Sequence, residues 1–239
     1  MGLSIHYTLS ARQPLTDADV RKLVSQARDF ALQSSAEEVS PLIEVESDFP
    51  LAQEWIPLHP ASEDEPTHLN VPPDYGWIFT AFPGEGCESV LLGLCRYPAT
   101  VRYEGRDLPV KGGTGWRLQH ACKTQFSSLR GWETFRRCHL LVLELLNFWR
   151  SLGISVRIQD EGGYWPRRSE KVLREKLNEM NGIVAAMSGA LKDDPRGLSV
   201  ISPIFDHPQF EHLEAQGAEQ HREKLAQAIK TVAKAARKQ

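Results

Sequence analysis

The residues whose side chains could do chemistry lie in three short motifs that are far apart in the sequence. The first is Ser4–Tyr7, the second runs from Gln119 to Phe126, and the third is Asp160–Trp165. They supply imidazoles, an amine, amides, carboxylates and aromatic rings, from which a polar pocket can be built. The candidate site residues are His6, His120, Lys123, Gln125, Asp160, Glu161, Tyr164 and Trp165.

The first two motifs alternate as strands do. In a strand, Ser4 and His6 share one face, so His6 either joins a site or is hydrogen-bonded within the fold. His120 and Cys122 also share a face, and a thiolate–imidazole pair there would be a nucleophile. Lys123, on the opposite face, could bind a carboxylate, either on a ligand or on Asp160. An edge strand with a mixed polar face explains the same residues, and we favour it over the nucleophile.

The third motif places two carboxylates before two glycines and two aromatic rings. Adjacent carboxylates could bind a metal or act as acid and base. In an extended chain, however, Asp160 and Glu161 point to opposite faces, so only one of them enters a given site. A structural interpretation is favoured: Asp160 caps the turn and Glu161 pairs with Arg167 or Arg168. The two aromatic rings would then close the core.

The order of these motifs resembles a family of uncharacterised bacterial proteins that has no assigned activity. The likeness rests on SIHY at Ser4–Tyr7, KTQF at Lys123–Phe126 and DEGGYW at Asp160–Trp165, and it covers roughly residues 2–191. The resemblance implies a bacterial, cytoplasmic protein in which the three segments meet in one place. A separation of more than about 15 Å between Lys123 and Asp160, far beyond hydrogen-bonding distance, would remove that shared site.

The hydrophobic pattern around the motifs predicts an α+β fold. We expect an antiparallel-rich sheet packed by helices, a split βαβ-like sandwich, with a C-terminal helical tail. Strands are expected over residues 3–10, 39–46, 76–81, 89–95, 100–104, 116–126 and 154–158. Helices are expected after an N-cap at residue 16, over residues 132–152 and 169–191, and from residue 218 onwards.

These elements indicate one α+β domain over residues 1–192, followed by a C-terminal extension with a basic helix over residues 193–239. A proline-rich excursion at about residues 49–73 is typical of a long surface loop. The helix at residues 170–191 carries an apolar stripe at heptad-like spacing. That stripe predicts a packing face for another helix or for a second subunit, so a homodimer is one alternative.

Charge and cysteine usage limit the classes of function. The formal net charge is −3 and the pI is about 6.3, which is below the range of typical nucleic-acid binders. Acidic residues concentrate in the first 95 residues and basic ones after them, so we expect the two halves to attract each other. The four cysteines form no CxxC pair, and no secretion signal or membrane span is predicted. Reduced thiols in a cytoplasmic protein are therefore expected.

The leading hypothesis is a binding or interaction module whose polar pocket takes a small molecule or a protein ligand. One alternative is a hydrolase or transferase that uses Asp160 or Glu161 as base, with His120 or Lys123 polarising the substrate. Another is a nucleic-acid-associated protein that uses the basic C-terminal half. Neither a metal nor a cofactor is assigned, because the sequence has no phosphate-binding loop or metalloprotease motif.

Overall fold

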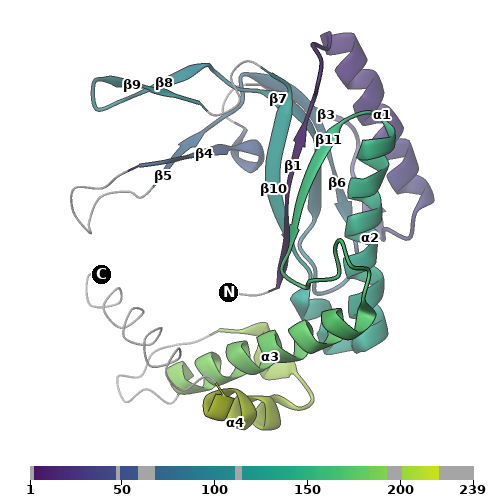
Figure 1. Ribbon diagram of the computed structural model, residues 1–239, viewed down its shortest axis with the longest axis vertical. Helices are drawn as coiled ribbons and strands as arrows, with labels where there is room; N and C mark the ends of the chain where they lie inside the picture. The colour runs from purple at the N-terminus through teal and green to yellow at the C-terminus, as the bar shows by residue number, and fades with distance from the viewer. Residues whose placement is uncertain (1–2, 47–48, 59–67, 111–114, 193–200, 221–239) are drawn as a thin grey trace.

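The computed structural model describes residues 3–46, 49–58, 68–110, 115–192 and 201–220. A sheet lies at the centre, two helices cover one of its faces, and two hairpins project on the other side (Figure 1). The fold is α+β, with an antiparallel sheet packed by helices and a C-terminal helix, as the sequence predicted. Within the described part of the chain, no helix has both the length and the apolar content needed to cross a membrane.

The central sheet has seven strands in the order β11-β1-β10-β7-β6-β2, with β3 also paired to β6. Its strands are β1 (Ser4–Ser10), β2 (Glu38–Val39), β3 (Ile43–Glu46), β6 (Tyr75–Phe82), β7 (Val90–Arg96), β10 (Arg117–Lys123) and β11 (Ser155–Asp160). The strand pairs are antiparallel. In β1, Ile5, Tyr7 and Leu9 are buried and the residues between them are not, so the predicted alternation is confirmed.

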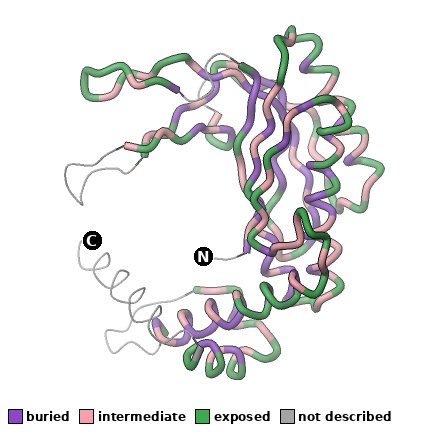
Figure 2. The backbone as a smooth tube through the Cα atoms, in the orientation of Figure 1, coloured by how far each residue is buried: buried purple, intermediate pink, exposed green. Residues whose placement is uncertain are grey.

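Two helices cover one face of the sheet: α1 (Asp17–Gln33) and α2 (Trp132–Ser151). Helix α1 begins at the predicted cap. Asp19 N donates to the Thr16 hydroxyl, and Thr16 N donates to the Asp19 carboxylate. Phe148 of α2 stacks on Phe30 of α1, with 4.0 Å between ring centroids. Figure 2 shows that buried residues concentrate in the sheet and on the sides of these helices that face it.

The chain's C-terminal elements lie at one end of the sheet (Figure 1). They are α3 (Glu170–Lys192), the 3-10 helix η3 (Pro203–Asp206) and α4 (Phe210–Gln220). The apolar stripe of α3 is covered by the chain itself. Leu173 and Leu177 pack with Leu3, and Val184 packs with Leu213 of α4. The stripe therefore does not require a second subunit.

Helix α4 begins eight residues before the helix that the sequence predicted from residue 218, because residues of its first turns already pack on α3. Residues 221–239, which carry most of the predicted basic helix, lie outside the described residues. The domain boundary at residue 192 stays a prediction.

The proline-rich stretch differs from the predicted surface loop. It contains the 3-10 helix η1 (Pro50–Ala52) and a hairpin of β4 (Glu54–Pro57) and β5 (His68–Val71). Buried contacts order this stretch. The Glu54 carboxylate pairs with Arg117 of β10, and the Tyr97 hydroxyl donates to Ala52 O at 2.7 Å. Residues 59–67 lie outside the described residues. A second hairpin pairs β8 (Thr100–Tyr103) with β9 (Arg106–Pro109).

Candidate functional site

The three sequence motifs meet at one end of three neighbouring strands. Strand β1 lies between β10 and β11, and its register pairs Ser4 with Lys123 and Ile5 with Asp160. Two strand spacings place the backbones of Lys123 and Asp160 about 10 Å apart, well inside the 15 Å limit. The segments therefore converge, but their side chains divide between a buried network and the open face of the sheet.

The buried network links the ends of β10 and β11 to helix α2. The Thr124 hydroxyl lies 2.9 Å from His139 Nδ1, and His139 Nε2 lies 3.2 Å from Asp160 Oδ1. This second contact has ion-pair distance but lacks the alignment of a good hydrogen bond. Asp160 also accepts bonds from Gly162 N at 2.7 Å and Trp165 N at 2.8 Å. The predicted turn-capping role of Asp160 is thus confirmed.

The electrostatics of Asp160 favour its charged form. Burial alone would raise the pKa of its carboxyl, but the contact with His139 and the two backbone N–H donors outweigh burial and lower the pKa. Hydroxyl, imidazole and carboxylate follow the order of a nucleophile, its base and an orienting acid. However, Thr124 and His139 are fully buried and the side chain of Asp160 has no exposed surface, so no substrate reaches the hydroxyl. We assign this network to structure.

His139 was not among the predicted site residues, although it lies in the helix expected over residues 132–152. The available signal was a single histidine among the buried positions of that helix, since an enclosed imidazole needs a partner. The partners could not be named from the sequence, because Thr124 follows β10 and Asp160 ends β11, and these two strands flank β1 on opposite sides.

A second buried network accounts for Gln125, a predicted site residue. Its Oε1 accepts from Leu3 N at 2.8 Å, and its Nε2 donates to Asn181 Oδ1 at 2.8 Å. Asn181 Nδ2 in turn lies 3.3 Å from Ser128 Oγ. Gln125 thus joins the N-terminal strand to helix α3, and it does not face a cavity.

Three other candidates have partners that the sequence did not predict. Lys123 Nζ lies 3.3 Å from the Glu88 carboxylate, so its ion-pair partner is Glu88 and not the predicted Asp160. Glu161 accepts from Ser4 N at 2.8 Å and lies 3.4 Å from His6 Nε2, so the expected arginine partner is wrong. Glu161 and Asp160 do point to opposite faces, as predicted.

The two aromatic candidates pack at the edge of the core. Tyr164 and Trp165 are partly buried against the main hydrophobic cluster, which agrees with the predicted closing role. The guanidinium groups of Arg150 and Arg168 lie 4.7 Å and 5.0 Å from the Trp165 ring centre. Trp165 is a predicted site residue, but it is not among the residues that line the pocket described below.

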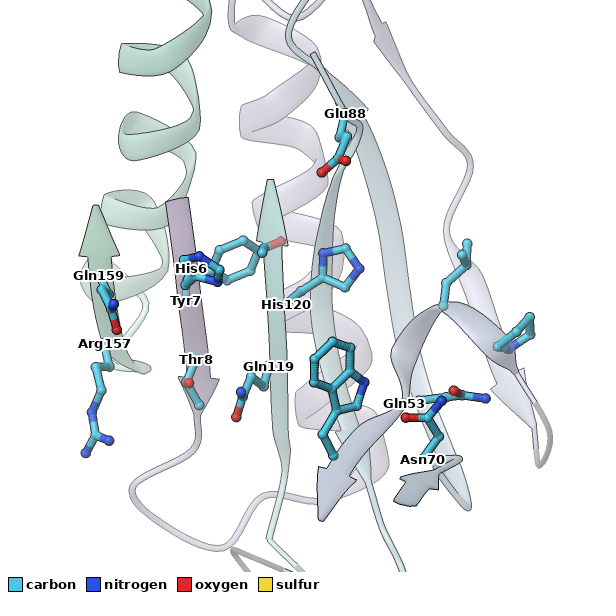
Figure 3. Close-up of a pocket in the computed structure, with 14 residues that line it drawn as sticks. His6, Tyr7, Thr8, Gln53, Asn70, Glu88, Gln119, His120, Arg157 and Gln159 are labelled. Carbon is cyan, nitrogen blue, oxygen red and sulfur yellow. The ribbon is translucent and has the colours of Figure 1, made fainter. Parts of the chain in front are cut away.

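A pocket of about 730 Å³ lies on the open side of the sheet, opposite helices α1 and α2. Figure 3 shows labelled side chains entering it from β1, β10 and β11 on one side and from the β4–β5 region on the other. The residues that line it are His6, Tyr7, Thr8, Pro50, Leu51, Gln53, Trp55, Asn70, Glu88, Gln119, His120, Ala121, Arg157 and Gln159. Among the eight predicted site residues, His6 and His120 are in this lining.

The alternation of three strands builds the floor of this pocket. His6 pairs across the strands with Ala121 and Gln159, while Thr8 pairs with Gln119 and Arg157, so the side chains of these residues share the open face. The apolar residues between them point to the helices. The polar face of β1 was predicted from the sequence, but Arg157 and Gln159 of β11 were not among the predicted site residues.

The charged groups of the pocket differ in whether they have an ion-pair partner. Arg157 has no ion-pair partner among the described residues, whereas Glu88 is paired with Lys123 and His6 contacts Glu161. Burial lowers the pKa of His120, so its imidazole is neutral at pH 7. In the described part of the chain, the enclosed His120 Nδ1 makes no well-aligned hydrogen bond.

The wall opposite the strands is apolar and aromatic. Trp55 stacks on His68 across the β4–β5 hairpin, with 4.9 Å between ring centroids, and it stays 64% exposed. Leu51 in η1 is also exposed. Gln53 and Asn70 add amide groups beside them. Trp55 and the hairpin were not part of the predicted site, because the sequence suggested only a loop there.

No protein-family model, no curated protein and no solved structure matches this chain. Its chemistry is therefore argued from the site itself. Over the described ranges, no three His, Cys, Asp or Glu side chains are grouped so that they could hold a metal ion.

Proposed function

We propose that the protein binds a small polar molecule that carries a carboxylate, in the pocket between the open sheet face and the β4–β5 hairpin. Arg157 carries this proposal, because it is an exposed cation in the pocket lining and has no ion-pair partner among the described residues. A guanidinium group matches a carboxylate with two parallel hydrogen bonds. The carboxylate of the bound acid would be the negatively charged partner of the Arg157 guanidinium.

The other lining groups suit the rest of such a ligand. Gln119, Gln159, Gln53 and Asn70 each offer both donors and an acceptor, so they fit a neutral polar group. Trp55 offers an exposed ring face on which a flat group can stack. A volume of about 730 Å³ lies within the usual range of small-molecule sites, about 300–1,000 Å³.

A screen of small carboxylic acids tests the proposal, with binding measured by ligand-observed NMR on the full chain. We expect at least one acid to bind the parent protein and to lose about tenfold or more in affinity with Arg157→Gln, since a charge-assisted hydrogen bond contributes about 1.5–3 kcal/mol. Arg102→Gln on the exposed strand β8 is the matched control and should keep the affinity. Acids that bind both variants equally, or the absence of any binder, would contradict the proposal.

A second candidate function, hydrolysis or group transfer in the same pocket, is favoured by one contact. His6 lines the pocket, and its Nε2 lies 3.4 Å from the Glu161 carboxylate, which Ser4 N also holds. A carboxylate behind an imidazole is the arrangement that orients a general base. The base in this candidate function is His6. Asp160 is not available for that role because it contacts His139, and Lys123 is paired with Glu88.

This second candidate predicts a separation of binding from turnover. In the parent protein, a bound ester or amide of the preferred acid should be cleaved. His6→Gln should abolish cleavage and leave the affinity for the free acid within about threefold, because the carboxylate contact stays with Arg157. Equal cleavage rates with and without His6 would exclude it as the base.

A further inference from the structure

Two cysteines that do not line the pocket meet where the loop between β6 and β7 packs on helix α2. Cys87 is in that loop and Cys138 is in helix α2. Cys87 N donates to Gly84 O at 3.0 Å, and a Cβ on that same Gly84 would lie 3.1 Å from Cys138 Sγ. Cys87 Sγ also lies 4.0 Å from Thr124 O, and Cys138 Sγ lies 3.3 Å from Pro83 O. The two sulfur atoms thus approach from a loop and a helix that are far apart in sequence.

The loop is seated closely enough to keep this approach. Gly86 has φ +82°, and a Cβ at this position would lie 2.5 Å from the carbonyl carbon and oxygen of Phe126. The loop therefore rests directly on the 3-10 helix η2 (Gln125–Arg130), with no side chain between them. Cys87 is partly exposed and Cys138 is buried, so Cys87 marks the route from solvent to the pair.

The surroundings favour a thiolate on one of the two sulfur atoms. The hydrogen bond from Cys87, and then the adjacent Arg137 and Ser127, lower the pKa of Cys138 to about 7 even though burial opposes this. The same hydrogen bond, with burial, raises the pKa of Cys87. Cys138 is therefore the sulfur of the pair that ionises near neutral pH, while Cys87 remains a thiol.

We propose that Cys87 and Cys138 form an oxidation site that a hydroperoxide converts to an intramolecular disulfide. In the first step, the Cys138 thiolate attacks the O–O bond. An S–O bond forms, the O–O bond breaks, and the alcohol or water leaves after taking up a proton. Cys138 is then a sulfenic acid, and the hydroperoxide has accepted the two electrons.

In the second step, the Cys87 sulfur attacks the sulfur of the sulfenic acid. The S–S bond forms, the S–O bond breaks, and the released hydroxide leaves as water with the proton from Cys87. The overall reaction turns two thiols and one hydroperoxide into a disulfide, an alcohol and water. A dithiol reductant reverses the change.

The remaining cysteines are poor competitors for this reaction. Burial raises the pKa of Cys95 to about 12. Cys122 donates to Glu88 O at 3.2 Å, and burial raises its pKa above the ordinary value. Both thiols stay protonated at neutral pH, and protonated thiols react slowly with peroxides.

Peptide mapping of the full chain tests the site, with hydrogen peroxide as the probe. The reduced protein is treated with peroxide near pH 7, and its remaining thiols are alkylated in denaturant. We expect the protein to lose the mass of two hydrogen atoms, a cross-linked peptide pair that contains Cys87 and Cys138, and alkylation of Cys95 and Cys122. Dithiothreitol should restore four reactive thiols.

The variants Cys87→Ser and Cys95→Ser separate this reaction from general oxidation. Cys87→Ser should lose the cross-link and accumulate sulfenic or higher acids at Cys138, while Cys95→Ser should behave as the parent protein. The proposal is overturned if all four cysteines of the treated parent protein remain alkylatable. Cross-links that join Cys95 or Cys122, or two separate chains, overturn it equally. The parent map decides the matter even where a variant fails to fold.

Discussion

At the scale of single residues, Asp160 has two structural roles: it caps a turn and it contacts a histidine of helix α2. Its position after a strand and before two glycines predicted a turn cap, and both of its oxygens accept backbone N–H groups of that turn. The same carboxylate also holds His139, which anchors helix α2. The carboxylate that the sequence offered as a catalytic base is therefore a buried structural group, and its neighbour Glu161 faces the open side.

Asp160→Asn tests this structural role. The amide removes the negative charge opposite His139 and brings an N–H group to a site built for acceptors, so we expect about 1–3 kcal/mol lower free energy of unfolding at pH 7. Urea denaturation followed by circular dichroism measures it. Asp29→Asn, at an exposed position of α1, is the control and should change stability by less than about 0.5 kcal/mol. A loss no larger than that of the control would remove the structural role.

The pH dependence of stability has a definite sign at Asp160. Its pKa in the folded state is lowered from the ordinary value of 3.8, so its contribution is fully present above that value. It is lost as the pH falls through the lower pKa of the folded state. The stability difference between the parent protein and Asp160→Asn should therefore be constant from pH 5 to pH 7 and shrink below about pH 4. A constant difference down to pH 2 would show that the charge does not contribute.

Residue 162 must be glycine because the neighbours of the Asp160–His139 network leave no room for a side chain. A Cβ there would lie 2.6 Å from Leu173 Cδ1, 3.0 Å from Asp160 Oδ1 and 3.1 Å from His139 Cε1. We expect Gly162→Ala to lower the melting temperature by an amount equivalent to about 1–3 kcal/mol. In a Leu173→Ala background, the closest clash is gone, so the added loss should be smaller. Equal losses in both backgrounds would mean that Leu173 is not the limiting contact.

At the scale of elements, the β4–β5 hairpin depends on a buried ion pair. Glu54 is 3% exposed, and its carboxylate meets Arg117 of β10, whose guanidinium also lies 5.7 Å from the Tyr97 ring. Removing one partner leaves the other charge buried, so Glu54→Ala should cost about 3–5 kcal/mol. Replacing both residues by leucine should recover most of that loss. Thermal unfolding distinguishes the outcomes, and a double variant as unstable as Glu54→Ala would contradict the ion-pair explanation.

The predictability of each element follows from the range of the interactions that form it. The strand at residues 4–10 and the cap at Thr16 were predicted because alternation and a capping box are written in consecutive residues. The β4–β5 hairpin was missed because its stability comes from Arg117, more than sixty residues away, and from Tyr97. Local composition around its prolines indicated only a loop.

At the scale of the whole molecule, the pocket exists because helices cover only one face of the sheet and leave the other face open. The helices bury Ile5, Tyr7 and Leu9, and the polar residues between them face the hairpin. The sequence predicted His6 and His120 as site residues from their types. It could not add Arg157 or Trp55, because their relation to β1 is set by strand order and by a hairpin that folds over the sheet.

The most direct test of the binding proposal is a two-dimensional amide and indole NMR titration of the full chain with the best carboxylic acid from the screen. We expect the largest shifts at the backbone of Thr8, Gln119 and Arg157 and at the indole N–H of Trp55, with a saturable dependence on concentration. Arg157→Gln should weaken these shifts together, and Arg102→Gln should leave them unchanged. Shifts confined to surfaces away from the pocket, such as α3 and α4, would contradict the proposed site.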